Sequence, residues 1–522
     1  MLEPFHLLIL LGAVTALGYI LSQHGLDPRE PPEVHSKVPV IGHLLGLMRH
    51  GMGYFSRIAA ENSSHPIFTI NLLTNKQYIV TSPSLMQAVQ RNKRTLKFAP
   101  LVNFTAERFA GIPESGMRLL RDREAGGAGL SAETVHAMEK TLIGPSLDRM
   151  NEEMARMLSQ LVDELAASPQ TVDLYAWCTR AITAASTNAS YGPKNPYKDS
   201  AIADAFWTFE TNIAPLITGI FPSIMARKAY RARETTFAAV LAYFQTKGHE
   251  QGSELTNTRY RVMHAGGLSD TDIARAEVSM GLGLLSNTVP AAFWVLFDLY
   301  SRPSLLCEVR EEVMKHAVRI KDTQTPMGKK HIIDISALRD SCPFLVSAYQ
   351  EILRTRSASA VTRVVTENTV LDNRYFLKKG GVVSIPASVM GAAESVWGPE
   401  SASEFNPRRY MRQTTPHGST SPRRTGGFMS FGVSPTICPG RHFAFSEILA
   451  LVAMVILRID LTPVDDGAWK APEKNSMAIA SGMCPVKGEF WVKVARRESE
   501  GEGVEWGVEA REGSGMFNLM VG

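Results

Sequence analysis

A cysteine, Cys438, lies in a loop rich in glycine and proline, directly before a long apolar stretch. Residues 431–444 read FGVSPTICPGRHFA, and the continuation HFAFSEILALVAMVIL after Arg441 predicts an apolar helix. The glycines let the backbone approach a flat ligand, and Pro439 stiffens the turn. Backbone N–H groups at the start of the helix can donate hydrogen bonds to the sulfur. A metal would stabilise such a thiolate most strongly. An isolated Cys-Pro-Gly loop favours a buried structural cysteine, and it is the rest of the chain that favours a metal ligand here.

The other cysteines do not suggest a zinc site. The chain has five cysteines, and the sequence contains no C-x-x-C pair or Cys/His cluster. Their odd number and wide spacing favour a reducing compartment over a disulfide framework. The net charge of +4 is nearly balanced, so nucleic acid is not predicted as a partner.

Two charged motifs precede the cysteine loop. In SAYQEILRTR, Glu351 and Arg354 are three residues apart and would share one face of a helix. The segment FNPRRYM then supplies Arg409. An exposed ion pair would contribute little to stability. If Arg409 joins the pair in a buried network, however, the network would fix the irregular segment that leads to the cysteine loop.

The longest helical pattern covers residues 270–301, enough to cross the whole molecule. Its centre carries Ser286, Asn287 and Thr288, followed by Pro290. Because proline has no N–H, it removes the helical hydrogen bond to the Ser286 carbonyl, and we expect a kink or an opening there. The opened carbonyl and the polar side chains beside it offer a seat for an oxygen molecule, a water or a substrate oxygen.

An apolar segment begins the chain. Residues 5–21, FHLLILLGAVTALGYIL, carry no charge and are just long enough to span a bilayer. A cleaved signal peptide is the alternative, but Glu3 stands where basic residues are expected and no clear A-x-A site follows. Basic residues after the segment predict a cytosolic domain. We expect a membrane anchor over 1–24, a proline-rich hinge over 25–45, a catalytic domain over 46–495 and a mobile Gly/Glu-rich tail over 496–522.

Helical patterns dominate from about residue 130 to 351, and the strand-like runs FTINLL, QYIVTS, GGVVSIPAS and EFWVKVA are short. The predicted fold class is mainly α with small β-sheets. No G-x-G-x-x-G or P-loop motif stands between a strand and a helix, so the usual nucleotide-binding sites are not predicted.

Taken together and in this order, the E-x-x-R helix, the F-x-P-x-R segment and the F-G…C-P-G loop resemble a membrane-anchored cytochrome P450. The resemblance covers nearly all of residues 1–495 and implies the cytochrome P450 fold with one N-terminal transmembrane helix. It implies haem as the cofactor, with Cys438 as the axial thiolate ligand of the iron and Phe431 packed near the ring. It also implies Arg363 and Lys140 as candidate partners of the haem propionates.

The chain departs from the family pattern at two places. Ser434 replaces a glycine of the cysteine loop and Thr436 a basic residue, so one propionate contact is expected to be weaker. Ser286 and Asn287 stand where most relatives carry an acid followed by threonine. The strings SNTVPAAFW and TICPGR resemble the subgroup of cholesterol and oxysterol 7-hydroxylases and prostacyclin synthase. The general character resembles enzymes of fungal secondary metabolism.

The resemblance implies a haem-thiolate monooxygenase in the endoplasmic reticulum membrane, with its catalytic domain in the cytosol. It would use O2 and electrons from an NADPH-cytochrome P450 reductase on a lipophilic terpenoid, steroid or polyketide. Basic residues near the loop could dock the reductase: Arg408, Arg412, Arg423, Arg424 and Arg441. A haem-thiolate isomerase or dehydratase that needs no electrons is one alternative, because the subgroup includes enzymes that isomerise a peroxide. A non-catalytic haem-binding protein is another.

Overall fold

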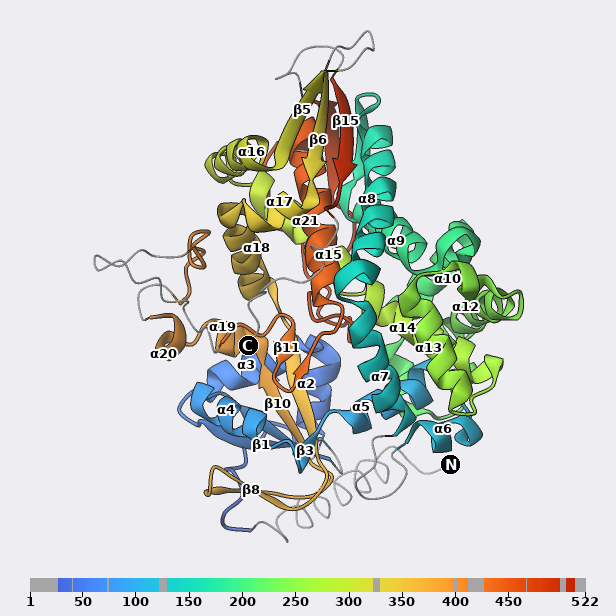
Figure 1. Ribbon diagram of the computed structural model, residues 1–522. Coiled ribbons are helices and arrows are strands. Elements are labelled where there is room, and N and C mark those ends of the chain that lie inside the picture. The colour runs from blue at the N-terminus through green and yellow to red at the C-terminus, as the bar shows by residue number, and fades with distance from the viewer. Residues whose placement is uncertain are drawn as a thin grey trace, which may run out of the picture.

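The computed structural model describes residues 27–39, 41–72, 75–121, 129–322, 329–398, 402–411, 427–465, 467–497 and 504–511. In these residues the chain is mainly helical with small sheets, as the sequence predicts (Figure 1). The predicted anchor segment lies outside the described residues.

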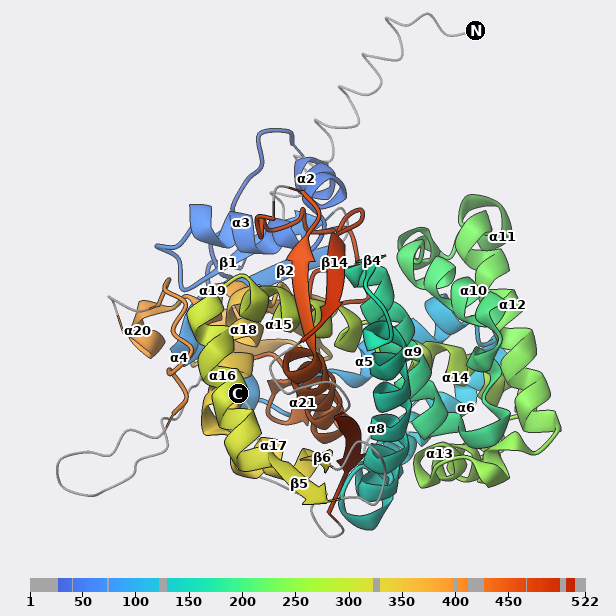
Figure 2. The ribbon, with the colours of Figure 1, turned by 90° about the horizontal axis from the view of Figure 1, so that it is seen from above.

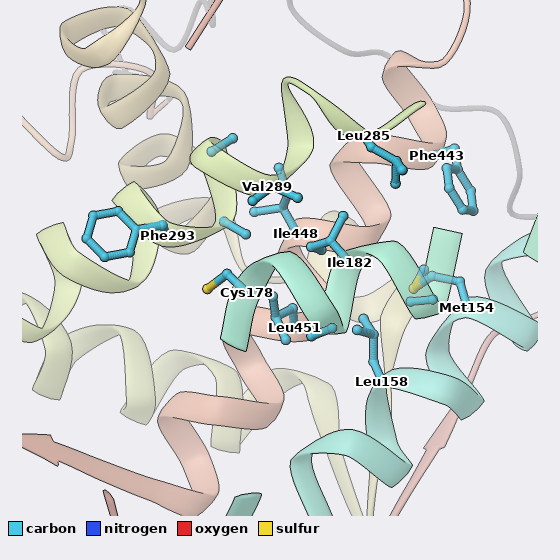
Figure 3. Packing of buried hydrophobic residues seen from close by; sticks show 14 of the residues in the cluster. Met154, Leu158, Cys178, Ile182, Leu285, Val289, Phe293, Phe443, Ile448 and Leu451 are labelled. Atoms are coloured by element: carbon cyan, nitrogen blue, oxygen red, sulfur yellow. The ribbon is translucent and has the colours of Figure 1, made fainter. Parts of the chain in front are cut away.

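Two apolar helices meet at the centre of the molecule. Helix α21 (Arg441–Arg458) is apolar on every side and buried along almost its whole length, as expected for a helix inside a core. It packs against α8 (Gly144–Ala166) and α15 (Thr288–Tyr300), and α15 also packs against α9 (Leu174–Tyr191). Figure 3 shows side chains of these helices, and of the helix that precedes α15, gathered in one cluster, among them Met154, Leu158, Cys178, Ile182, Leu285, Val289, Phe293, Phe443, Ile448 and Leu451.

The predicted long helix is broken where Pro290 predicts an opening. Helix α14 (Asp270–Leu285) ends before Ser286 and Asn287, and α15 begins at Thr288. At the other end, Ser269 caps α14, since its hydroxyl accepts a hydrogen bond from the Asp272 N–H at 3.2 Å. By length and composition, Asp270–Tyr300 could cross a membrane, but 78% of its most apolar window is buried inside the protein. It is a core helix whose two halves meet at the break.

The largest sheet lies beside the helical body and has five strands, in the order β1 (Ile67–Leu72), β2 (Asn75–Val80), β10 (Val382–Pro386), β7 (Ala360–Val365) and β3 (Leu96–Lys97). Strands β10 and β2 run parallel, with Val383 opposite Tyr78, and the other pairs are antiparallel. Strand β7 carries Arg363, opposite Val383.

The end of the chain differs from the prediction. The tail over 496–522 was expected to be mobile, but Arg496 ends strand β14 (Trp491–Arg496), and Glu505–Glu509 form strand β15. Strand β15 pairs in parallel with β6 (Lys329–Asp334), which also pairs with β5 (Val318–Asp322). The Trp506 ring packs on His331, with ring centroids 5.0 Å apart, and Lys330 pairs with Glu505. The prediction of a mobile tail relied on its content of glycine and glutamate. It overlooked the alternating apolar residues Trp506 and Val508, which are typical of a strand.

The remaining described helices are α2 (Gly42–His50), α3 (Gly53–Glu61), α4 (Pro83–Arg91), α5 (Ala99–Thr105), α6 (Glu114–Leu120), α7 (Leu130–Thr141), α10 (Ser200–Thr211), α11 (Pro222–Met225), α12 (Arg227–Gln245), α13 (Glu254–Ala265), α16 (Pro303–Ala317), α17 (Ile335–Asp340), α18 (Pro343–Arg356), α19 (Ala387–Gly391) and α20 (Glu394–Trp397). The remaining strands are β4 (Gln170–Asp173), β8 (Thr369–Leu371), β9 (Tyr375–Leu377), β11 (Gly432–Val433), β12 (Thr436–Ile437) and β13 (Ile459–Pro463).

Candidate active site

The cysteine loop is a small hairpin followed by the N-terminus of α21. Strands β11 and β12 form the hairpin, and the Cys438 N–H donates to the Phe431 carbonyl at 2.8 Å. Gly432 has a φ of +83°, and a Cβ there would lie only 2.7 Å from the Thr436 carbonyl oxygen, so the hairpin needs glycine at this position. The fold therefore brings Phe431 and Cys438 together, as the sequence predicts.

The surroundings of Cys438 suit a thiolate held by a metal. Burial raises the pKa of the thiol, whereas the Gly440 N–H, the Arg441 charge and the Arg441 N–H lower it. The donors that favour a negative sulfur are therefore in place, but burial still disfavours the free thiolate. A bound metal ion would remove that penalty by keeping the sulfur deprotonated.

The predicted ion network exists and is buried. Glu351 accepts hydrogen bonds from Arg354 Nη2 at 2.7 Å and Arg354 Nε at 2.8 Å. Arg409 Nε donates to the same carboxylate at 2.9 Å, as does the Asn406 N–H at 2.8 Å. The side chains of Glu351, Arg354 and Arg409 are 0%, 3% and 1% exposed, so this is not a solvated surface pair. One carboxylate therefore joins α18 to the segment that follows α20.

The two guanidinium groups also hold backbone. Arg354 donates to the carbonyls of Ala402 at 2.8 Å and Glu404 at 2.9 Å, and to that of Gly391. Arg409 donates to the Glu404 carbonyl as well, at 2.9 Å. These bonds satisfy donors that would otherwise be buried and unpaired, and they fix an irregular stretch that has no sheet or helix ladder of its own.

Arg363 is a buried cation beside the cysteine hairpin. It is 4% exposed and donates only to carbonyl oxygens, of Thr362 at 2.9 Å and Val433 at 3.4 Å. Burial lowers the pKa of its guanidinium, and no carboxylate of the described residues pairs with it. A buried cation of this kind is suited to an anionic group of a bound ligand.

Lys140 is in a different situation from Arg363. It lies in the last turn of α7, where its side chain is exposed, and no hydrogen bond or ion pair joins it to another described residue. The structure therefore brings Arg363, Phe431 and Cys438 to one hairpin but leaves Lys140 at the surface.

A loop from the C-terminal part of the chain closes on the helix break. The Ser481 hydroxyl donates to the Ser286 carbonyl at 2.7 Å, and the Gly482 N–H donates to Asn287 Oδ1 at 2.6 Å. The opening predicted from Pro290 is therefore confirmed, but the carbonyl is not a free seat because Ser481 occupies it. Nothing in the local sequence SMAIASGMCP, which contains Ser481 and Gly482, indicates these partners.

The three polar side chains at the break differ in whether they already make a hydrogen bond. Asn287 has its oxygen bound to Gly482, and the Thr288 hydroxyl donates to the Leu284 carbonyl at 3.2 Å. The Ser286 hydroxyl is buried and makes no hydrogen bond with any described residue.

Sequence reasoning missed Glu210, in the last turn of α10. It is 6% exposed, and burial raises the pKa of its carboxyl to about 7, while the nearby hydroxyls of Ser286 and Thr211 lower it. The only sequence signal was an acid inside the apolar run DAFWTFETNIAPLI. Its approach to Ser286 depends on how α10 packs on α14, which spacing along the chain does not reveal.

Comparison with known proteins identifies this arrangement. A family profile described as cytochrome P450 matches residues 31–488. A cytochrome P450 monooxygenase, nodJ of Hypoxylon pulicicidum, is 40% identical over 501 residues, which cover 95% of each chain. Cytochrome P450 7A1 of Sus scrofa is 26% identical over 511 residues, covering 92% of this chain and 97% of that protein. The solved structure of a retinoic-acid-bound cyanobacterial CYP120A1 has the same fold, with a TM-score of 0.67 and 17% identity over 90% of this chain and 99% of that one. The half-buried cysteine before an apolar helix, the Glu351 network and these matches lead to one conclusion: the chain belongs to the cytochrome P450 family and is a haem-thiolate monooxygenase.

Proposed function

We propose that Cys438 is the axial ligand of the haem iron and that Arg363 binds a haem propionate. The N–H groups of Gly440 and Arg441 favour a negative sulfur at Cys438, which supports the first role. The buried guanidinium of Arg363, which donates to the Val433 carbonyl of the same hairpin, supports the second. When bound, the haem supplies the iron that activates dioxygen, and a thiolate ligand favours O–O cleavage.

Phe431 and Lys140 have supporting roles in this proposal. The Phe431 carbonyl accepts the Cys438 N–H and so fixes the backbone next to the sulfur, while its ring packs near the haem. Lys140 is a second propionate partner that would reach inward from α7. The hydroxyl of Thr436, in place of a basic residue, makes the Arg363 contact more important.

On the opposite side of the haem, Ser286, Asn287 and Thr288 line the place where dioxygen and substrate meet. Asn287 holds the loop at Gly482 against the helix break, and Thr288 caps the backbone at Leu284. These two contacts hold the break between α14 and α15 in one geometry. The Ser286 hydroxyl takes part in neither of them and can therefore hold or move a proton.

The substrate is a lipophilic small molecule of terpenoid, steroid or polyketide type, in secondary metabolite biosynthesis. Fungal relatives, among them nodJ, a monooxygenase of Gibberella zeae and poxD of Penicillium oxalicum, support this proposal. Buried aromatic residues of α10, such as Phe206 and Phe209, add apolar surface near the break.

The enzyme is bound to the endoplasmic reticulum membrane by a single N-terminal helix, with its domain in the cytosol. An exposed apolar patch at α11 supports this: it is formed by Phe221 and Ile224, which are 72% and 73% exposed. Met48 of α2 is a separate exposed apolar side chain, at 63%. In the view of Figure 2, α2 and α11 lie in the same half of the molecule, with strands between them. Apolar side chains this exposed are expected to enter a membrane surface, and Arg227 and Lys228 follow directly.

The redox partner is an NADPH-cytochrome P450 reductase that docks near the cysteine loop. Arg441 lies next to Cys438 and donates to its carbonyl at 3.1 Å, and Arg408 is exposed. Arg412, Arg423 and Arg424 lie outside the described residues. A cationic face of this kind would steer an acidic flavoprotein toward the haem.

The thiol of Cys438, to which the N–H groups of Gly440 and Arg441 point, is the observation that carries the proposed haem ligation, and replacing it is the direct test. The Cys438→Ser variant should lose the red-shifted Soret band of the reduced carbon monoxide complex, because an alcohol does not replace the thiolate. Cys484→Ser, at a buried cysteine elsewhere in the fold, is the control and should keep the band. An unchanged spectrum in Cys438→Ser would exclude this residue as the ligand.

A monooxygenase needs electrons from the reductase, whereas an isomerase does not, so the electron requirement distinguishes the two functions. NADPH oxidation should depend on the reductase and should rise when a substrate is added. Full conversion of a peroxide or epoxide substrate with no reductase present would instead support the isomerase.

The Glu351 network predicts loss of haem when one member is removed. Arg409→Ala leaves part of a buried carboxylate unpaired, so the free energy of unfolding should fall by about 3–5 kcal/mol and haem occupancy should fall with it. Haem per protein, measured as the pyridine haemochromogen, is the readout. Arg408→Ala is the control, since Arg408 pairs with Glu308 at the surface. Equal haem content in both variants would contradict the structural role of the network.

The exposed apolar patch predicts membrane binding that does not need the N-terminal anchor. In cell fractionation, most of a protein that lacks residues 1–24 should appear in the soluble fraction, but the purified protein should still bind lipid vesicles. Adding Phe221→Ser and Ile224→Ser should weaken this vesicle binding about ten-fold, because two inserted apolar side chains are lost. Ile320→Ser, at an exposed apolar position on β5, should have no effect. Vesicle binding that resists the double substitution would place the membrane surface elsewhere.

A further inference from the structure

Glu210 is an acid that the fold does not neutralise. It is 6% exposed, and it forms no ion pair with any described residue. Burying a carboxyl without a cation is unfavourable, and Glu210 belongs to a helix whose Phe206 and Phe209 are fully buried. Unpaired buried acids of this kind are concentrated at functional sites.

The groups that face Glu210 leave it free to titrate. From α9, Tyr175 is close enough for Glu210 to raise its pKa. On α12 and α14, which pack on α10, Arg233 and Arg275 both bind Glu234. On α14, Glu277 binds Arg259 of α13. The short helix at Pro196–Lys198, which also packs on α10, contributes Tyr197 and the exposed Lys198, whose ammonium donates to the Pro193 carbonyl at 3.0 Å.

The Ser286 hydroxyl is the polar group that meets Glu210 at the helix break. It directly follows α14, on which α10 packs, and it lies near enough to lower the pKa of the carboxyl, although its hydroxyl makes no well-formed hydrogen bond with any described residue. Its neighbours Asn287 and Thr288 already have partners, so Ser286 is the side chain of the three that can still accept and pass on a proton. A bridging water or a small rotation of the hydroxyl would complete the contact.

We propose that Glu210 is the proton donor for dioxygen reduction in this enzyme, and that it acts through the Ser286 hydroxyl. The inference rests on the proposed haem site at Cys438. In this proposal the acid, Glu210, comes from α10, and the alcohol, Ser286, lies at the break between α14 and α15. The two groups thus form an acid–alcohol pair assembled from separate elements.

The proton balance of monooxygenation requires such a donor. One oxygen atom of O2 enters a C–H bond of the substrate and the other becomes water, which consumes two electrons and two protons. The electrons come from NADPH through the redox partner. Ser286 passes its proton toward the oxygen and takes one from the Glu210 carboxyl. The resulting carboxylate takes a proton from water beside the exposed Thr211, the next residue in the chain.

The sign of the pH dependence follows from the carboxyl's pKa of about 7. Below that pH, Glu210 is the neutral acid and can donate. Above it, the carboxylate predominates and proton delivery should slow. The rate should therefore fall as the pH rises through about 7, unless Glu210 is removed.

The test uses the full-length holoenzyme with NADPH and the reductase and with no added substrate, so that two electrons and two protons reduce O2 to hydrogen peroxide. Glu210→Gln keeps the size of the side chain but cannot donate an acidic proton. It should lower NADPH oxidation about ten-fold or more, should flatten the decline between pH 6 and 8, and should leave the carbon monoxide spectrum intact. Ser286→Ala should give the same loss. Asp204→Asn, an exposed acid on the same helix, should behave like the wild type.

A second readout does not depend on turnover. The infrared C=O band of a neutral carboxyl should titrate near pH 7 in the wild type and should be missing in Glu210→Gln. The neutral carboxyl of Glu447, whose pKa burial raises to about 8, should persist in that variant and serve as an internal reference. If Glu210→Gln retains no haem, this band in the wild type and the Ser286→Ala kinetics still decide the question.

The outcomes are distinct. A normal carbon monoxide spectrum with a wild-type rate and pH profile in Glu210→Gln would overturn the proton-donor role and leave the haem site standing. A carboxyl band that titrates near pH 4 would also overturn it. Absence of the shifted carbon monoxide band in the wild type would instead reject the proposed ligation by Cys438.

Discussion

The carboxylate of Glu351 is the contact on which the haem side of the molecule depends. Two guanidinium groups share it, one from the same helix and one from a segment more than fifty residues later. That segment has no regular ladder of hydrogen bonds, so its carbonyls are satisfied by the same guanidinium groups that neutralise the acid. Such a network gains little net energy over a well-packed apolar core, because all three charges must leave water. Its value lies in specifying one path for the chain toward Cys438.

The opposite side depends on a different constraint. A proline in the middle of a long helix leaves one carbonyl without its helical donor, and burial then requires another donor. Ser481 supplies it from nearly two hundred residues away, and Gly482 secures the neighbouring Asn287. A Cβ at residue 482 would lie 3.2 Å from Asn287 Oδ1 and 3.0 Å from the Ser359 Cβ, so the close approach favours glycine. The break is thus a joint between three distant parts of the chain, and its shape is set by the loop as much as by the proline.

The sequence could predict interactions between residues close together in the chain, but not those that depend on how distant elements pack. The break at Pro290 and the helix after Cys438 are local, since missing N–H groups and apolar runs act within one or two turns. The Glu351–Arg354 pair is also local, and Arg409 was placed with it through the order of the motifs. Burial of Arg363 against Val433 and the exposure of Lys140 depend on how β7 and α7 pack, which no spacing reveals. Glu210 was missed for the same reason: an acid in an apolar helix has meaning only once its neighbours are known.

Strand β15 has a consequence for how the protein is made. Strand β6 can pair with β5 as soon as both have left the ribosome, but its other edge stays open until residues 505–509 are synthesised. An unpaired strand edge can recruit strands from other molecules. The open edge is short-lived in a chain that contains β15 and permanent in one that lacks it. A protein that ends before Glu505, through premature termination or proteolysis, would therefore keep its cysteine loop but expose an unpaired edge of β6. Its fate in the cell would depend on aggregation through this edge and not on its catalytic activity.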